Sequence, residues 1–233
     1  MNFNPTASEM KEGSVILIDK PFRWTSFDAI NKIKRVAQVK IGHCGTLDPL
    51  ATGLLVCCTG SMTKQIEKFQ KQDKEYTGSF FLGAVTPTYD LESEPEQHKA
   101  ITHLSEEEII ETTKNFVGLI QQLPPAHSAI RKGGKRLYEL ARAGIEVKLE
   151  PRTVHIHEFE ITKIDLPQVF FRVKCGTGTY IRSLANDFGA ILGVGAYLSS
   201  LTRTKIGDLN VEQARNIDEW IEYLKQFKEE ESI

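Results

Sequence analysis

The stretch GHCGTLDPLATGLLVCC, residues 42–58, joins a glycine-containing loop to a short apolar run. The run LLVCC predicts a buried strand, because a brief apolar segment bounded by turn residues is typical of one. Asp48 is the only acid of the loop, and the proline after it keeps Asp48 out of the helical conformation. Asp-Pro is also the ordinary beginning of a β-turn. The loop is therefore either a plain turn or a turn that presents a carboxylate.

The glycines of this loop, Gly42, Gly45 and Gly53, allow a close approach. What approaches, another stretch of backbone or a ligand, is left open by the sequence. His43 is equally ambiguous, since a single histidine in a loop is more often structural or solvated than catalytic.

Outward from this loop, periodicity and turn residues predict an irregular series of helices and strands. Thr25 with Asp28 predicts a capping box at the start of a helix. Helices are also expected over 62–69, after Ser105, up to Ala143, after Thr179 and around Trp220; strands over 14–21, 54–58, 76–83, 152–162, 168–175 and before the last helix; and irregular loops over 86–103 and 121–136. Strands and helices that do not alternate regularly favour an α+β fold, with a mixed, mainly antiparallel central sheet flanked by helices and loops.

The chain has 233 residues, and we expect residues 1–233 to form a single catalytic domain. Within it, the sequence predicts a basic loop and helix inserted at about 121–150 and a short helical tail at about 212–230. The sequence has no apolar run of membrane-spanning length and no signal peptide at its polar beginning. A cytoplasmic protein, by default a monomer, is therefore expected.

Candidate metal and nucleophile residues are sparse. The four cysteines form no C-x-x-C pair, which argues against a zinc ribbon or a disulfide framework. Cys44 has no base at a recognisable spacing. His155 and His157 share one face of a strand, but no third ligand is visible nearby. We expect no metal and no nucleotide-cofactor motif.

Charge is unevenly distributed along the chain. The net charge is −2, yet residues 91–112 carry −6 and residues 209–233 carry −4, so the remaining residues are net basic by eight. Such a distribution fits a surface that follows a phosphate backbone, and it also fits ordinary solubilising charge.

Two further positions suggest chemistry. In GTGTYIRSL (176–184), Thr179 is the expected N-cap, which places Arg182 in the first turn of a helix. A cation is disfavoured there by the helix dipole, so Arg182 is either simply exposed or paired with an anion. Tyr76 opens a strand, where it is either an ordinary edge residue or a surface on which a nucleobase stacks.

Together these segments resemble the TruB-type family of bacterial tRNA pseudouridine-55 synthases. Five motifs carry the resemblance, in the expected order over about residues 13–208: LIDKP (17–21), GHCGTLDPLATGLL (42–55), TGSMTK (59–64), KEYTGSFFLG (74–83) and GTYIRSLANDFG (178–189). Met62 and Pro87 depart from the family pattern. The family often carries a C-terminal RNA-binding PUA domain, and we expect none here, because about twenty residues follow the last core strand before Ile233. RNA affinity would then come from basic segments such as 32–40 and 131–142.

The resemblance also implies roles for individual residues. Asp48 corresponds to the catalytic aspartate, Tyr76 to the tyrosine that stacks on the target uracil, and Arg182 to the arginine that pairs with the catalytic carboxylate. The expected substrate-binding residues are His43, Tyr180, Leu201, Lys20 and Asp90, with Asp90 joining the Arg182 network.

The implied reaction is the isomerisation of the T-loop uridine, position 55 of tRNA, to pseudouridine. It requires cleavage of the C1′–N1 bond, rotation of the flipped-out base and formation of a C5–C1′ bond, and it needs no cofactor. The expected partner is the tRNA T-stem-loop, with no membrane and no obligatory protein partner. Two alternatives remain open: the catalytic subunit of a guide-RNA-directed pseudouridylation particle, and a tRNA-binding or folding module.

Overall fold

The structure, a computed structural model, describes residues 2–127, 131–132, 135–136, 145 and 149–230. The chain forms two compact units. Unit 1 contains the chain up to Tyr76 and again from Leu201, and unit 2 contains Thr77–Ser200. Strands β4 (Lys74–Leu82) and β10 (Ala196–Ile206) each run from one unit into the other.

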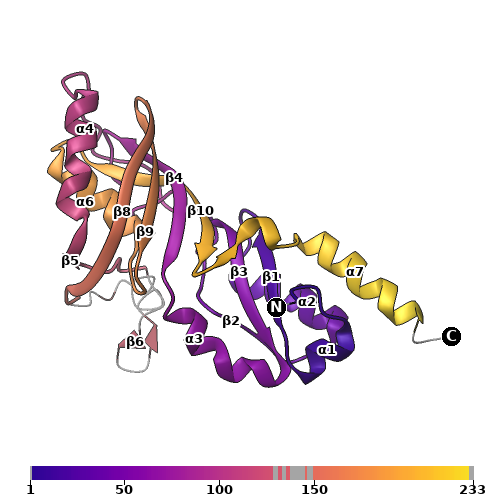
Figure 1. Cartoon of the computed structure of the whole chain (residues 1–233). Helices are drawn as coiled ribbons and strands as arrows, with labels where there is room; N and C mark the ends of the chain where they lie inside the picture. The colour runs from indigo at the N-terminus through magenta and orange to yellow at the C-terminus, as the bar shows by residue number, and fades with distance from the viewer. Residues whose placement is uncertain (1, 128–130, 133–134, 137–144, 146–148, 231–233) are drawn as a thin grey trace. The chain divides into compact units, whose positions relative to one another are not determined.

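Unit 1 is built around strand β3 (Thr52–Thr59), the strand expected from LLVCC. Its elements are α1 (Ala7–Glu12), β1 (Val15–Lys20), α2 (Ser26–Ala37), β2 (Ile41–His43), the 3₁₀ helix η1 (Gly60–Gln65), α3 (Ile66–Gln70), β11 (Leu209–Asn210), the 3₁₀ helix η3 (Val211–Gln213) and α7 (Ile217–Glu230). Strands β1 and β2 pair with β3 antiparallel, and β10 pairs with β3 in parallel, with Arg203 opposite Gly53. Figure 1 shows β1 and β3 side by side in this unit.

Both faces of the β1–β3 pair are buried. One face carries Ile16 and Leu55, which pack with residues of α2 and α7. The other carries Leu17 and Val56, which pack with Phe69 and its neighbours. Because successive strand residues point to opposite faces, apolar residues at every position are what such a doubly covered strand requires. The terminal helix is fixed here by a bond from the Trp220 indole N–H to the Leu17 carbonyl, 2.9 Å long.

Three local predictions in unit 1 have different outcomes. The capping box at α2 is confirmed, since the Thr25 hydroxyl accepts from the Asp28 N–H at 3.0 Å and the Asp28 carboxylate accepts from the Thr25 N–H at 3.1 Å. The helix expected over 62–69 begins instead as the 3₁₀ helix η1, and only α3 is α-helical. The terminal helix expected around Trp220 is present as α7.

Unit 2 is a sheet covered by helix α6 (Ile181–Ile191). Its other elements are α4 (Glu106–Thr112), the 3₁₀ helix η2 (Thr113–Phe116), β5 (Gly118–Gln122), β6 (Arg131–Lys132), β7 (Lys135–Arg136), β8 (Arg152–Asp165) and β9 (Gln168–Cys175). The strand order is β4-β9-β8-β5, and the pairs β5–β8 and β8–β9 are antiparallel. Aromatic rings fill the core, with Phe80 and Phe171 centroids 4.3 Å apart and Phe80 and Phe188 5.5 Å apart.

The α+β class with a mixed, mainly antiparallel sheet is confirmed. The predicted loop over 121–136 differs in part, because Gln121 and Gln122 complete β5 and β6 pairs with β7. The helix ending at Ala143 lies outside the described residues, so the insertion at 121–150 stays a prediction. The single-domain assignment also stays a prediction, since two compact units joined by shared strands need not be separate domains. None of the described helices has the length and apolar character that crossing a bilayer demands.

Candidate active site

Asp48 lies between β2 and β3, in residues 45–54, which include the first residues of β3 and are called the Asp48 loop below. The Ala51 N–H donates to the Asp48 carbonyl at 3.1 Å, which closes a four-residue turn with Pro49 at its second position. The turn predicted from Asp-Pro is therefore present. Asp48 itself is half-buried.

Ser26, at the first position of α2, holds the residue before Asp48. Its hydroxyl accepts from the Leu47 N–H at 2.9 Å and donates to the Leu47 carbonyl at 3.1 Å. Because both polar groups of Leu47 are bound by one buried hydroxyl, the backbone entering Asp48 is fixed in position.

Arg203 binds both ends of the Asp48 loop. This side chain of β10 is 2% exposed, and its Nε donates to the Leu54 carbonyl at 2.8 Å while Nη2 donates to the Gly45 carbonyl at 3.0 Å. The rigid guanidinium fork can reach both carbonyls at once, so it fixes the distance between the two loop ends. Sequence reasoning missed Arg203, although strand alternation places it on the same face as Leu201, where an arginine must find buried acceptors.

The glycines of the loop region accommodate protein atoms. Gly53 has φ +95°, and a Cβ there would lie 2.5 Å from the Arg203 carbonyl oxygen. A Cβ on Gly42 would lie 2.8 Å from Cδ1 of Ile66. Of the two possibilities left open by the sequence, close approach of backbone to backbone therefore applies at Gly53, whereas the neighbour of Gly42 is the flexible end of a side chain.

Lys20 is fully buried at the end of β1. Its Nζ donates to the carbonyls of Trp24 at 2.5 Å, Pro21 at 3.0 Å and Pro49 at 3.3 Å. Burial lowers the pKa of Lys20 to about 8; the charge of Asp48 acts in the opposite direction, and that of Arg203 lowers the pKa further. Lys20 therefore fixes the turn that carries Asp48 and interacts electrostatically with its carboxylate.

His43 ends β2, and its Nδ1 accepts from the Gly45 N–H at 3.3 Å. Burial, and then the charge of Arg203, lower the pKa of His43 below its ordinary value. The imidazole is therefore neutral at pH 7 and has one ring nitrogen as an acceptor for the loop backbone.

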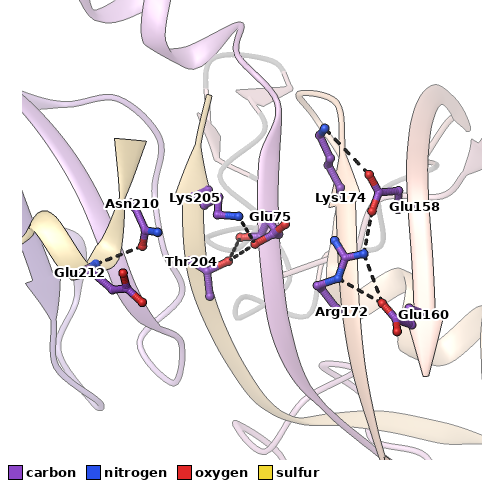
Figure 2. Close-up of polar contacts among 9 residues, drawn as sticks. All are labelled: Glu75, Glu158, Glu160, Arg172, Lys174, Thr204, Lys205, Asn210 and Glu212. Carbon is purple, nitrogen blue, oxygen red and sulfur yellow. Dashed lines mark hydrogen bonds and ion pairs between the residues drawn. The ribbon is translucent and has the colours of Figure 1, made fainter. Parts of the chain in front are cut away.

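Tyr76 lies in β4, beside two residues with strong local partners. The ammonium of buried Lys74 donates to the carbonyls of Gln70 and Gln72, at the end of α3. The carboxylate of Glu75 accepts from the Thr204 hydroxyl at 3.0 Å and lies 3.2 Å from Nζ of Lys205, as Figure 2 shows. These contacts fix the backbone on the N-terminal side of a half-buried Tyr76.

Leu201 is the last of the predicted site residues in unit 1. It is buried, and its carbonyl accepts from the Thr52 hydroxyl at 3.4 Å. The first residue of β3 is thereby tied to β10.

Arg182 and Asp90 meet in unit 2. Both are about 4% exposed, and Nε of Arg182 lies 3.6 Å from Oδ2 of Asp90. The guanidinium also donates to the carbonyls of His127 at 2.9 Å and Thr88 at 3.4 Å. The expected network of Arg182 with Asp90 is present. The Asp90 carboxylate lies beside the Arg182 cation in the first turn of α6, where the helix dipole favours negative charge.

The expected N-cap, Thr179, is wrong by one residue, because Tyr180 is the N-cap of α6. The Thr179 hydroxyl donates to the Gly176 carbonyl at 3.0 Å, which closes the turn before the helix. The buried amide of Gln122 accepts from the Tyr180 N–H at 2.8 Å and donates to the Tyr180 carbonyl at 3.0 Å. Gln122, which sequence reasoning missed, thus binds the N-cap residue of α6.

Five of the predicted site residues, Lys20, His43, Asp48, Tyr76 and Leu201, belong to unit 1, and the other three, Asp90, Tyr180 and Arg182, belong to unit 2. The pairing of Asp48 with Arg182 and the substrate contacts of all eight stay predictions.

The remaining candidates from the sequence offer little chemistry. A hydrogen bond to Cys58 and burial raise the pKa of Cys44 far above its ordinary value, so a reactive thiolate does not form. The rings of His155 and His157 lie 4.2 Å apart. Within the described ranges, no group of three or more His, Cys, Asp or Glu side chains is arranged to hold a metal ion.

Comparison with known proteins defines the class. Residues 32–181 match the family model described as "TruB family pseudouridylate synthase (N terminal domain)". The chain therefore belongs to the TruB family of pseudouridylate synthases. More particularly, it is 54% identical to tRNA pseudouridine synthase B of Flavobacterium johnsoniae, over 91% of this chain and 96% of that protein. It is 45% identical to tRNA pseudouridine synthase B of Phocaeicola vulgatus, over 96% of this chain and 98% of that protein.

Solved structures confirm the pseudouridine synthase fold. A chain of a Cbf5-Nop10-Gar1 complex is 30% identical, with a TM-score of 0.73 over 98% of this chain. A chain of an H/ACA RNP bound to a substrate RNA containing 2′-deoxyuridine is 28% identical, with a TM-score of 0.71 over 97% of this chain. The present chain spans 59% and 57% of the lengths of those two chains.

Proposed function

We propose that this protein converts the T-loop uridine of tRNA, position 55, to pseudouridine, with Asp48 as the catalytic carboxylate. The observation that carries the proposal is the fixed turn at Asp48. Its backbone is bound on both sides, by Ser26 at Leu47 and by Lys20 at Pro49. It occurs in a chain 54% identical to a tRNA pseudouridine synthase B.

The reaction suits a carboxylate without further reagents. The C1′–N1 bond breaks, the uracil turns, C5 bonds to C1′, C5 loses its proton and N1 gains one, so there is no net oxidation. A carboxylate can attack C1′, stabilise positive charge on the sugar or accept the C5 proton. Each of these roles needs an oxygen held at a defined position, and the bonds to Leu47 and Pro49 fix the backbone that carries the Asp48 carboxylate.

Tyr76 and Arg182 complete the proposed catalytic set. The Tyr76 ring would stack on the uracil once the nucleotide is flipped out of its loop. The Arg182 guanidinium, buried beside Asp90, would stabilise charge during the reaction. His43, Tyr180, Leu201, Lys20 and Asp90 are proposed to shape and orient the site.

The deciding experiment uses an unmodified tRNA transcript labelled with tritium at uracil C5. Tritium release at position 55 supports the proposal, and Asp48→Asn should lower the rate at least about 10³-fold while tRNA binding persists. Asp165→Asn, a matched change at an exposed aspartate paired with Lys163, should leave the rate unchanged. Substantial activity of Asp48→Asn would refute the role of Asp48.

Arg182→Lys separates chemistry from binding. A point charge cannot reproduce the planar fork of contacts that Arg182 makes, so turnover should fall much more than tRNA affinity. An unchanged turnover number would exclude Arg182 from the chemical step.

A second function is kept because similar chains occur in complexes named H/ACA RNP. A catalytic subunit directed by guide RNA would release tritium only when a guide RNA is added. A tRNA-binding or folding module would bind the transcript and release none. The same assay therefore distinguishes all three.

We further propose that the enzyme works in the cytoplasm as a monomer, without metal, cofactor or obligatory protein partner. Full activity of the purified protein after treatment with a chelator supports the absence of a metal requirement. A single monomeric peak in light scattering, at the concentration of the assay, supports the monomer.

A further inference from the structure

The segment between β1 and the first turn of α2 exposes two aromatic rings. Phe22 is 54% exposed and Phe27 is 69% exposed. In the described part of the chain, the other large apolar side chains with comparable exposure are aliphatic. Exposed aromatic rings close together in sequence are typical of a binding surface, and a ring face is what a nucleobase stacks on.

Arg23 between them has an unusual backbone. Its φ is +65°, a conformation that disfavours residues with side chains, and its guanidinium carbon lies 5.5 Å from the centroid of the Phe22 ring. Backbone strain of this kind is often found where a site requires a particular geometry. Here it presents a cation beside an exposed ring.

This segment is tied directly to the turn that carries Asp48. Nζ of Lys20 donates to the carbonyls of both Trp24 and Pro49, which places these two oxygens within about 6 Å of each other. Phe22 and Phe27 flank Trp24 on either side in the sequence. The backbone of this segment therefore adjoins the backbone of the turn that carries Asp48.

Helix α2 continues the surface with positive charge. Phe27, Asn31 and Lys34 follow one another along one line of the helix, because they are spaced by four and three residues. Lys32, Lys34 and Arg35 are exposed. The one acid of this helix, Asp28, is engaged by the Thr25 N–H and hydroxyl in the capping box. The surface is therefore cationic, which suits a phosphate backbone better than an apolar protein partner.

We infer that Phe22, Arg23, Phe27 and Lys34, called the aromatic–basic strip, bind unpaired nucleotides that flank the target uridine. The two rings stack on bases, and the two cations contact phosphates. This inference rests on the proposed function, because it assigns a further part of the same RNA substrate to the surface next to Asp48.

The test measures tRNA affinity in the Asp48→Asn background, where turnover does not interfere. Phe22→Leu with Phe27→Leu keeps apolar side chains but removes both ring faces, and it should raise the Kd about tenfold or more. Phe22→Trp with Phe27→Trp keeps the faces and should stay within about twofold of the parent. Arg23→Ser should weaken binding and reduce the slope of log Kd against log salt by about one. Leu166→Ala, at an exposed aliphatic residue elsewhere, is the control and should change nothing.

The outcomes separate this inference from the proposed function. An unchanged Kd in the leucine variant would overturn the strip as an RNA site. So would self-association of the parent protein that the leucine substitutions abolish, since the strip would then be a protein interface. Absence of tritium release by the unmutated protein would instead refute the proposed function, while the effect on Kd would still decide whether the strip binds RNA.

Discussion

Nη2 of Arg203 donates to the Gly45 carbonyl at 3.0 Å, and Nε of the same side chain donates to the Leu54 carbonyl at 2.8 Å. One side chain from β10 thus determines how far apart the two ends of the Asp48 loop lie. The position of the Asp48 carboxylate therefore depends on a residue that is far from it in the sequence.

Arg203→Lys should therefore impair catalysis more than binding. Lysine keeps the charge but cannot reach both carbonyls, so the Asp48 loop shifts, and an error of about 1 Å in a reacting group costs about 10²-fold in rate. We expect kcat in the tritium assay to fall about 10–100-fold with little change in KM. Arg172→Lys, at a partly exposed arginine paired with Glu158 and Glu160 (Figure 2), is the matched control. Turnover within about twofold of the parent would contradict the assignment.

Lys20 should give the protein a distinctive pH dependence of stability. Its pKa is lowered from 10.5 to about 8 in the folded state. Between these values the unfolded chain keeps a proton that the folded protein has lost, so the free energy of unfolding rises with pH by up to about 1.4 kcal/mol per pH unit. Urea denaturation at pH 7–11 should show this rise in the parent and not in Lys20→Met. Parallel curves for the two proteins would refute the lowered pKa.

The buried pair of Arg182 and Asp90 should behave as a coupled unit. Asp90→Asn leaves a buried guanidinium without its carboxylate, which should lower the free energy of unfolding by about 3 kcal/mol or more. Adding Arg182→Met should recover part of this loss, because the unpaired charge is removed as well. Strictly additive effects in the double-mutant cycle would show that the two side chains do not interact. Removing either partner of the exposed pair Lys163–Asp165 should lower the free energy of unfolding by less than about 1 kcal/mol.

Gly53 and Gly178 provide a matched pair for the steric role of glycine. Both have positive φ, +95° and +85°, so alanine at either position costs about 1–2 kcal/mol of backbone strain. A Cβ at Gly178 meets no atom within 4 Å, whereas one at Gly53 lies 2.5 Å from the Arg203 carbonyl oxygen. Denaturation should therefore find Gly53→Ala clearly less stable than Gly178→Ala. Equal losses of stability in the two variants would mean that β10 can move away from the added Cβ without a cost in free energy.

What the sequence predicted correctly was local. The capping box of Thr25 and Asp28 needs only four consecutive residues, and LLVCC shows its burial within a single strand. The turn at Asp48-Pro49 is likewise predicted by two adjacent residues. In each case the physical cause and the signal occupy the same few positions.

What the sequence missed depends on distant parts of the chain. The contacts of Arg203 with Leu54 and Gly45 span 149 and 158 residues, and Gln122 is 58 residues from Tyr180. No periodicity or motif links such positions. The error at Thr179 has the same origin. Threonine is a favoured N-cap, but here its hydroxyl donates to the Gly176 carbonyl, and a distant glutamine binds the actual N-cap, Tyr180.

The division of unit 1 in the sequence sets an order of events during synthesis. Its first 76 residues leave the ribosome long before residues 201–233, which supply Arg203 for the Asp48 loop and Trp220 for Leu17. All of unit 2 is made in between. During synthesis, β1 and β3 of the nascent N-terminal part therefore lack cover from α7 until residues 217–230 have been made. A ribosome stalled before residue 203 would carry the motif of Asp48 with its bonds to Ser26 and Lys20 but without those to Arg203.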